Sequence, residues 1–90
     1  LSFKTFDEVI ERANNNDLGL CSYIYTNSME QAHKASELME SGTVAVNTAA
    51  VAVAEAPFGG IKQTGYGREG GSMAIKDYLN IKYTHLGLKS

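Results

Sequence analysis

Hydrophobic and polar positions follow two different periods along the first part of the chain. Apolar residues recur at helical spacing over residues 6–15, and Thr5 with Glu8 forms the Thr-x-x-Glu pattern that caps the start of a helix. The run Asn-Asn-Asn-Asp at 14–17 favours the end of that helix, since asparagine tolerates the left-handed conformation. Residues 20–26 are rich in strand formers, so this segment predicts a β-strand.

A second helix and a second strand follow at once. Ser28 is placed to cap the helix, with Gln31 three residues later, and Gly42 stands where a glycine commonly terminates a helix. The apolar stripe of this helix consists of Ala32, Ala35 and Met39. Residues 43–47 then read as a strand. Strand, helix and strand with short connections predict an α/β fold built on a βαβ unit with parallel strands.

Residues 48–71 lose the periodic pattern. They contain the only proline and six of the nine glycines, and they are too long for a simple connection inside a compact domain. We therefore expect a functional or interface loop here. A short helix is predicted to start at Ser72. Residues 80–88 predict a closing strand, which places three residues on one side: Ile81, Tyr83 and His85.

Composition narrows the classes of partner. The 90 residues are 43% hydrophobic and 20% charged, with a net charge of −2 and no cluster of lysine and arginine, which argues against nucleic acid. No apolar run approaches the roughly 20 residues of a membrane span, and no signal peptide pattern opens the chain. The single cysteine, Cys21, indicates a reducing compartment, so we expect a cytoplasmic protein. Because the chain begins at Leu1 without methionine, we also expect it to be a piece of a longer protein.

Gly65, Gly67 and Gly70 match the G-x-G-x-x-G pattern that binds dinucleotide phosphates. That pattern works where a buried strand runs directly into a helix N-terminus, and neither the residues before nor the short helix after fits this context. We therefore assign no cofactor to this segment. The glycines instead predict tight turns and close backbone contact.

Other chemistry-bearing residues lack a setting for catalysis. Cys21 lies in an apolar strand without a cationic neighbour, so we interpret its side chain as a packing residue and not as a nucleophile. His33 and His85 show no second ligand or carboxylate partner at useful spacing, and we expect no metal site. Arg68 and Glu69 predict a structural ion pair that pins the glycine loop. No catalytic residue is assigned.

Three stretches together resemble the C-terminal segment of the aldehyde dehydrogenase superfamily. They are GTVAVNT at 42–48, PFGGIKQTGYGREGG at 57–71 and DYLNIKY at 77–83, with SFKTFDEVIERANNNDLGLCSYIYT at 2–26 similar to the helix and strand that precede them. The pattern P-F-G-G-x-K-x-[ST]-G-x-G-R-E-G is the most specific part. Among branches, REGG and DYLNIKY are most similar to NAD(P)-dependent succinate-semialdehyde dehydrogenases.

This resemblance implies an enzyme that oxidises an aldehyde to an acid with NAD or NADP. A cysteine nucleophile and a glutamate general base carry such chemistry, and in the family both lie upstream of this segment, as does the dinucleotide site. The resemblance therefore implies that the segment alone is inactive and binds no cofactor.

The resemblance also places the loop after Asn47 at the entrance of the aldehyde tunnel. Ala50, Ala52 and Phe58 are then the candidate substrate-tunnel residues, although Phe58 could equally be a core residue that anchors the loop. Succinate-semialdehyde enzymes commonly have a serine that helps to bind the distal carboxylate where this chain has Ala52. A methyl group cannot make that bond, so either groups upstream replace it or the substrate is a less polar or differently shaped semialdehyde.

Domain organisation follows the same resemblance. Residues 1–71, with the tunnel loop 48–71, correspond to part of a catalytic domain, and residues 72–90 to a short helix and terminal strand for subunit contacts. The strand 80–88 implies a homo-oligomer. The competing interpretation is a free-standing, non-catalytic α/β module that dimerises through its last strand. A small nucleotide-binding protein that uses the three glycines is a third.

Overall fold

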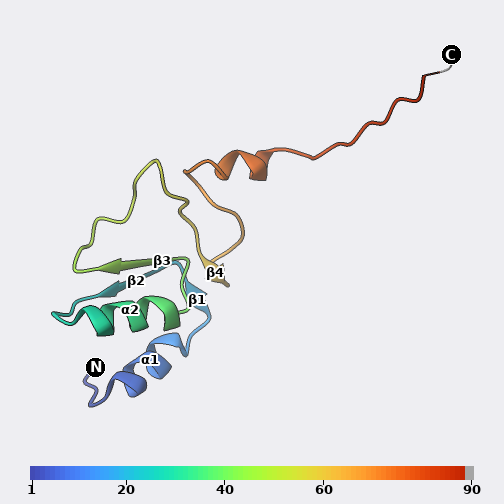
Figure 1. Cartoon of the computed structure of the whole chain (residues 1–90). Helices are drawn as coiled ribbons and strands as arrows, with labels where there is room; N and C mark the ends of the chain where they lie inside the picture. The colour runs from blue at the N-terminus through green and yellow to red at the C-terminus, as the bar shows by residue number, and fades with distance from the viewer. Residues whose placement is uncertain (89–90) are drawn as a thin grey trace.

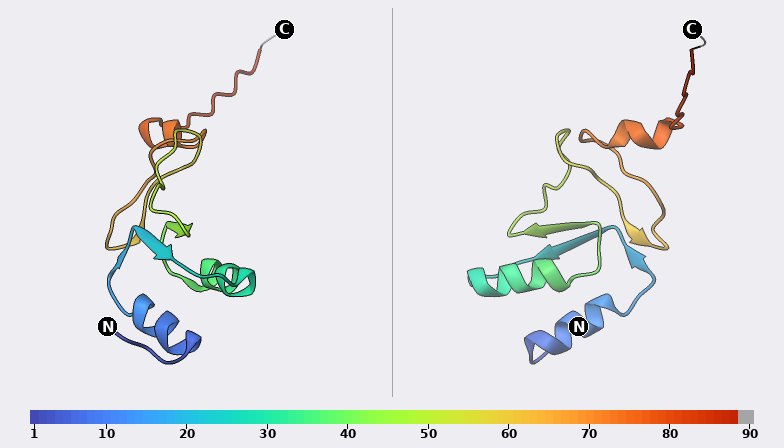
Figure 2. Two further views of the ribbon diagram at one scale, coloured as in Figure 1. Left: turned by 90° about the vertical axis from the view of Figure 1, so that its left-hand side faces the viewer. Right: turned by 45° about the vertical axis from the view of Figure 1, so that its right-hand side comes forward.

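The computed structural model describes residues 1–88 of the chain. Its elements are α1 (Phe6–Asn14), β1 (Leu18–Gly19), β2 (Cys21–Ile24), α2 (Met29–Leu38), β3 (Thr43–Val46), β4 (Ile61–Lys62) and the 3-10 helix η1 (Ala74–Tyr78). Figures 1 and 2 show both α-helices on one side of the β2–β3 pair, with the long loop that follows β3 on the other side. The α/β architecture predicted from the sequence is confirmed.

Both α-helices begin at the predicted caps. Thr5 Oγ1 accepts a hydrogen bond from the Glu8 backbone N–H at 3.2 Å, and Ser28 Oγ accepts from the Gln31 N–H at 3.2 Å. The Glu8 carboxylate accepts from the Lys4 N–H at 3.0 Å, one residue earlier than the capping pattern predicts. These caps satisfy N–H groups that a helix start leaves without intrahelical partners.

The predicted βαβ unit is confirmed in detail. Strands β2 and β3 are parallel, with register from Cys21 opposite Thr43 to Ile24 opposite Val46, and α2 forms the crossover between them. Three small residues are buried, namely Ala32 and Ala35 of α2 and Ala45 of β3. They are the only buried hydrophobic residues of the described chain, so its own core is small.

The prediction that Gly42 terminates α2 was wrong. The helix ends at Leu38 with Met39 as its cap, and Gly42 does not adopt the left-handed conformation. Gly42 instead lies where the backbone of Gly59 passes so closely that a Cβ atom would collide with it. The glycine is therefore required by contact with a distant loop and not by the local end of a helix.

A second, short strand pair was not predicted. Strand β1 pairs antiparallel with β4, with Leu18 opposite Lys62 and Gly19 opposite Ile61. The Gly19 N–H donates to Thr64 Oγ1 at 2.7 Å, and the Gln63 N–H donates to the Asp17 carbonyl at 2.8 Å. The β1–β4 pair therefore brings the end of the long loop next to the residues that precede the βαβ unit.

The end of the chain leaves the body of the molecule. The helix predicted from Ser72 is the shorter 3-10 helix η1, and residues 79–88 are extended but pair with no other described segment. Figure 1 shows this tail projecting away from the fold, and the molecule measures 75 × 24 × 20 Å. Residues 89 and 90 of the predicted 72–90 unit lie outside the described residues. Within residues 1–88, no helix is long and apolar enough to cross a membrane.

Candidate functional site

The long loop after β3 is held in place by the segment rich in glycine. We call residues 48–60 the wall loop and residues 65–71 the glycine segment. Phe58 and Glu69 form an isolated antiparallel bridge, with N–H to carbonyl distances of 2.6 and 2.7 Å in the two directions. The Gly71 N–H also donates to the Ala54 carbonyl at 2.7 Å. The two segments therefore run side by side with direct backbone contact.

The glycines permit this close approach. Gly70 has φ +68°, and a Cβ atom at that position would lie 2.9 Å from the Ala56 carbonyl oxygen. Gly67 has φ +83°, and its Cβ would lie 2.9 Å from a carboxylate oxygen of Asp77. A side chain at either position would be strained in backbone conformation, and at residue 70 it would also approach main-chain oxygens, so both positions favour glycine.

The glycine segment does not fit a dinucleotide. It lies between β4, which has two residues, and η1, a 3-10 helix of five residues, so no strand leads through it into an α-helix. The Asp77 carboxylate also stands beside Gly67, where it would repel a phosphate group. The backbone of this segment is used for contact with the wall loop instead.

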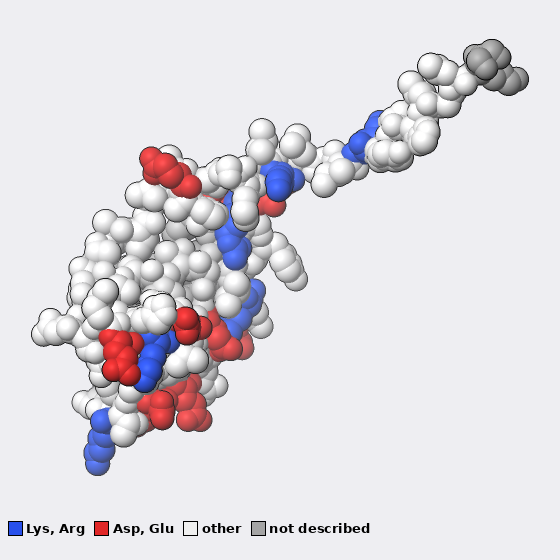
Figure 3. Space-filling view, viewed as in Figure 1, with Lys and Arg blue, Asp and Glu red and all other residues white. Residues whose placement is uncertain are grey.

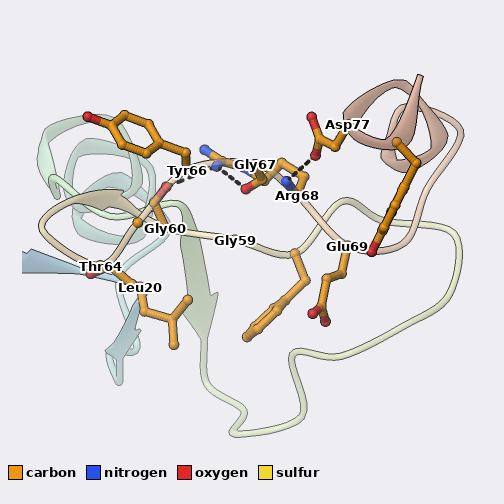
Figure 4. Close-up of a pocket in the computed structure, with 12 residues that line it drawn as sticks. Leu20, Gly59, Gly60, Thr64, Tyr66, Gly67, Arg68, Glu69 and Asp77 are labelled. Atoms are coloured by element: carbon orange, nitrogen blue, oxygen red, sulfur yellow. Dashed lines mark hydrogen bonds between the residues drawn. The ribbon is translucent and has the colours of Figure 1, made fainter. Parts of the chain in front are cut away.

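Arg68 binds main-chain carbonyls. Its Nη1 donates to the Gly60 carbonyl at 2.9 Å and to the Gly67 carbonyl at 2.8 Å (Figure 4). The predicted ion pair with Glu69 was wrong, because the salt bridges within residues 1–88 do not include this pair. Figure 4 shows the Glu69 carboxylate directed away from the guanidinium group. Arg68 still pins the glycine loop, but through carbonyl acceptors.

Phe58 lies between two open cavities. One, of about 360 Å³, is lined by residues of the wall loop and by Glu69 and Gly70, and it includes both Ala52 and Phe58. The other, of about 410 Å³, lies on the side of Thr64, Tyr66 and Arg68 (Figure 4). Ala50 lines neither cavity and is exposed. The structure thus brings two of the three candidate tunnel residues together, and their role in a tunnel stays a prediction.

Charge is sparse on the wall loop. Among residues 48–60 only Glu55 is charged, and Figure 3 shows that on the visible face most charged side chains gather over the two α-helices and near β4. Glu69 lines both cavities, Arg68 and Asp77 also line the larger one, and Glu55 lines neither. A largely uncharged wall suits enclosure of an uncharged reacting group.

Cys21 has no feature of an activated nucleophile. It is half-buried on β2, and its thiol donates a weak hydrogen bond to the Ser22 carbonyl at 4.0 Å. A side-chain hydrogen bond with Cys21, followed by the charge on its sulfur, raises the pKa of the Tyr23 hydroxyl above its usual value. Glu40 is the charged residue of the cavity beside Cys21, so the setting is not electropositive.

The two histidines make local contacts only. His33 does have a carboxylate partner, Glu37, at 3.3 Å along the exposed side of α2, which the sequence interpretation missed although the two residues stand at helical spacing. The Tyr83 hydroxyl and His85 Nδ1 are 3.1 Å apart on the tail. Across residues 1–88, no group of three or more metal-binding side chains forms.

Comparison with known proteins identifies what the chain is similar to. The profile of the aldehyde dehydrogenase family matches residues 1–84. The 3-sulfolactaldehyde dehydrogenase of Pseudomonas putida is 52% identical over 94% of this chain, and the mitochondrial succinate-semialdehyde dehydrogenase of Arabidopsis thaliana is 44% identical over 97%. The chain spans only 18% and 16% of these relatives. The NAD+ complex of an aldehyde dehydrogenase from Bacillus cereus superposes with a TM-score of 0.90 at 40% identity, over 99% of this chain and 18% of that one.

Proposed function

Because the chain belongs to the aldehyde dehydrogenase family, we propose that it is the C-terminal part of an NAD(P)-dependent enzyme that oxidises an aldehyde to a carboxylic acid. The observation that carries this proposal is the agreement of sequence and backbone over nearly the whole chain. Since the chain spans less than a fifth of its relatives, the activity belongs to a longer polypeptide that carries this segment. We call that polypeptide the complete dehydrogenase.

The segment contributes a wall and not the reacting groups. In this proposal the nucleophilic cysteine, the general base and the NAD(P) site are supplied by the rest of the complete dehydrogenase. In this proposal Ala52 and Phe58, which line one cavity, form one side of the substrate tunnel, together with Ala50. An aromatic and methyl surface excludes water from the aldehyde and holds it near the nucleophile.

The finer proposal concerns the substrate. We propose succinate semialdehyde, supported by the similarity to succinate-semialdehyde dehydrogenases. A second candidate is 3-sulfolactaldehyde, favoured by the 52% identity to the Pseudomonas putida enzyme that acts on it. Both aldehydes carry a distal anion. The wall loop offers no cation to that anion, and Ala52 offers no hydrogen bond donor, so an anion-binding group would come from elsewhere in the complete dehydrogenase.

Ala52→Ser should sharpen selectivity for a carboxylate substrate. The complete dehydrogenase is assayed by NAD and NADP reduction with succinate semialdehyde, 3-sulfolactaldehyde and hexanal. A new hydroxyl that donates to the carboxylate lowers the KM for succinate semialdehyde by about tenfold, since hydrogen bonds to charged groups contribute about 1.5–3 kcal/mol. The KM for hexanal, which has no distal acceptor, stays unchanged.

Several outcomes separate the proposals. No reduction of either nicotinamide with any aldehyde would contradict the enzymatic function and favour the non-catalytic dimerisation module. A higher kcat/KM for 3-sulfolactaldehyde than for succinate semialdehyde would replace the first substrate with the second. Equal changes in KM for hexanal and succinate semialdehyde in Ala52→Ser would place residue 52 outside the distal end of the substrate. Ala49→Ser, in the same loop but outside both cavities, is the matched control.

We further propose that the tail makes the subunit contacts of a homo-oligomer. Residues 80–88 are extended and pair with no other described segment, and Ile81 is 99% exposed. An exposed apolar strand of this kind pairs readily with the edge of another sheet. The tail thus forms, with η1, the contact unit 72–90, and residues 1–71 belong to the catalytic domain. We keep the cytoplasm as the proposed compartment, on the single cysteine.

Ile81→Asp should weaken this association. A carboxylate at an apolar contact must be desolvated without a partner, so the subunit dissociation constant rises by about tenfold or more. Sedimentation velocity of the complete dehydrogenase over a dilution series measures it. Lys82→Asp is the control, because the adjacent residue points to the opposite face of an extended chain. An unchanged dissociation constant in Ile81→Asp would exclude the tail from the interface.

A further inference from the structure

One carboxylate joins the root of the tail to the glycine segment. Asp77 lies in η1, immediately before the extended residues 79–88, and its Oδ2 accepts a hydrogen bond from the Arg68 backbone N–H at 2.8 Å. Figure 4 shows Asp77 directed from η1 toward Gly67 and Arg68. The approach depends on glycine at 67, since a Cβ atom there would lie 2.9 Å from the same oxygen.

The bond reaches the wall loop within one residue. Arg68 is followed by Glu69, whose backbone N–H and carbonyl form both bonds of the bridge with Phe58. The Arg68 side chain also donates to the Gly60 carbonyl at 2.9 Å, so it binds the end of the wall loop, two residues after Phe58. The Phe58 backbone is therefore fixed by Arg68 and Glu69 together, and Asp77 fixes the backbone of Arg68.

We infer that Asp77 is a positioning residue: through the Arg68 N–H and the Phe58–Glu69 bridge, it sets where the Phe58 ring stands between the two cavities. This inference rests on the proposed function in so far as Phe58 borders the aldehyde. It gives the root of the tail a direct mechanical connection to the substrate wall. This role requires an acceptor oxygen at the position of Asp77 Oδ2, because the donor that Oδ2 binds is the Arg68 backbone N–H.

The acceptor requirement distinguishes two substitutions. Asp77→Asn keeps an oxygen of the same reach that accepts from the Arg68 N–H, although without the charge. Asp77→Ala removes the acceptor and leaves the Arg68 N–H to water. The first variant should therefore retain the position of Phe58, and the second should lose it. Glu11→Ala is the matched control. Glu11 is an exposed residue of α1, and its carboxylate makes no hydrogen bond within residues 1–88.

The test follows Phe58 directly. 4-Fluorophenylalanine is placed at residue 58 alone in the complete dehydrogenase, and its 19F resonance is recorded for each variant. We expect a shifted or broadened signal in Asp77→Ala, and a signal like that of the unsubstituted protein in Asp77→Asn and Glu11→Ala. In the unlabelled enzyme, Asp77→Ala should raise the KM for hexanal by about fivefold with kcat within about twofold, as expected when only binding contacts are disturbed.

The outcomes keep the two proposals apart. An unchanged 19F signal in Asp77→Ala overturns the inference whatever the activity. A signal displaced equally in Asp77→Asn also overturns it, because an acceptor in the right place would then not suffice. A displaced signal in Asp77→Ala alone, in a protein that oxidises no aldehyde, supports the positioning role of Asp77 while it rejects the proposed enzymatic function.

Discussion

Gly42→Ala is expected to lower the free energy of unfolding by about 3 kcal/mol or more. A Cβ atom at residue 42 would collide with the carbonyl oxygen and carbon of Gly59 and approach the Cα of Gly60 at 2.9 Å. These atoms belong to the backbone, so no rotamer change relieves the contact. The Gly42 N–H also donates to the Gly19 carbonyl at 2.9 Å, which prevents residue 42 from moving away without loss of that bond.

The prediction is tested by urea unfolding of the complete dehydrogenase, followed by circular dichroism. Ala49→Ser is the control, because it also adds one heavy atom, at an exposed position that lines neither cavity. The control should change the free energy of unfolding by less than about 0.5 kcal/mol. A loss below about 1 kcal/mol in Gly42→Ala would show that the wall loop can withdraw from residue 42 at little energetic cost.

Gly42 also shows where sequence reasoning succeeds and where it fails. The sequence pattern predicts a local role for this glycine, at the end of α2. The actual reason for glycine at this position is the backbone of Gly59, which reaches residue 42 only after the long loop has folded back. A pattern along the chain cannot show this, because the contact depends on the path of residues that carry no periodic signal.

The elements that could be predicted are those with local causes. The caps at Thr5 and Ser28, the apolar stripe of α2 and the parallel β2–β3 pair all follow from neighbouring residues or from the chirality of a βαβ unit. The β1–β4 pair could not be predicted, since two residues are too few to show alternation.

For the candidate site too, some features could be predicted from the sequence and others could not. The resemblance to the family predicts substrate-tunnel residues in the loop 48–71, and the structure places Ala52 and Phe58 at one cavity but leaves Ala50 outside it. Arg68 was expected to bind the carboxylate next to it in sequence. It binds carbonyls instead, because the bridge to Phe58 turns the Glu69 side chain to the other side. In an extended pairing, adjacent side chains face opposite directions, which is a signal the sequence did offer.

Lys62→Met is expected to lower the free energy of unfolding by about 1–2 kcal/mol, because two main-chain carbonyls and a carboxylate lose a charged donor. Lys62 was not singled out in the sequence, yet its ammonium group joins three parts of the fold. Its Nζ donates to the Asn14 carbonyl at 2.9 Å, the Asn16 carbonyl at 3.2 Å and Glu40 Oε2 at 3.1 Å. The Lys62 side chain is 25% exposed, so water replaces these bonds only in part.

The position of this ammonium group explains the size of the effect. The carbonyls of Asn14 and Asn16 lie at the end of α1, where the last carbonyls have no intrahelical donors and a cation is favoured. The Asn14 side chain in turn binds the Leu38 carbonyl and the Glu40 N–H, each at 2.9 Å. Loss of the Lys62 cation therefore loosens the ends of both α-helices together with β4. Methionine keeps the apolar stem, so the variant isolates the charge.

Glu40→Gln separates the two kinds of partner of Lys62. The Glu40 side chain is 54% exposed, so its ion pair with Lys62 is screened, and its removal should cost less than about 1 kcal/mol. Urea unfolding at 0.05 and 0.5 M salt measures both variants. The loss in free energy of unfolding in Lys62→Met should persist at high salt, since the main acceptors of the Lys62 ammonium group are neutral carbonyls. If Glu40→Gln lowered the free energy of unfolding as much as Lys62→Met does, the stabilisation would come from the ion pair. The same conclusion would follow if the effect of Lys62→Met disappeared at high salt.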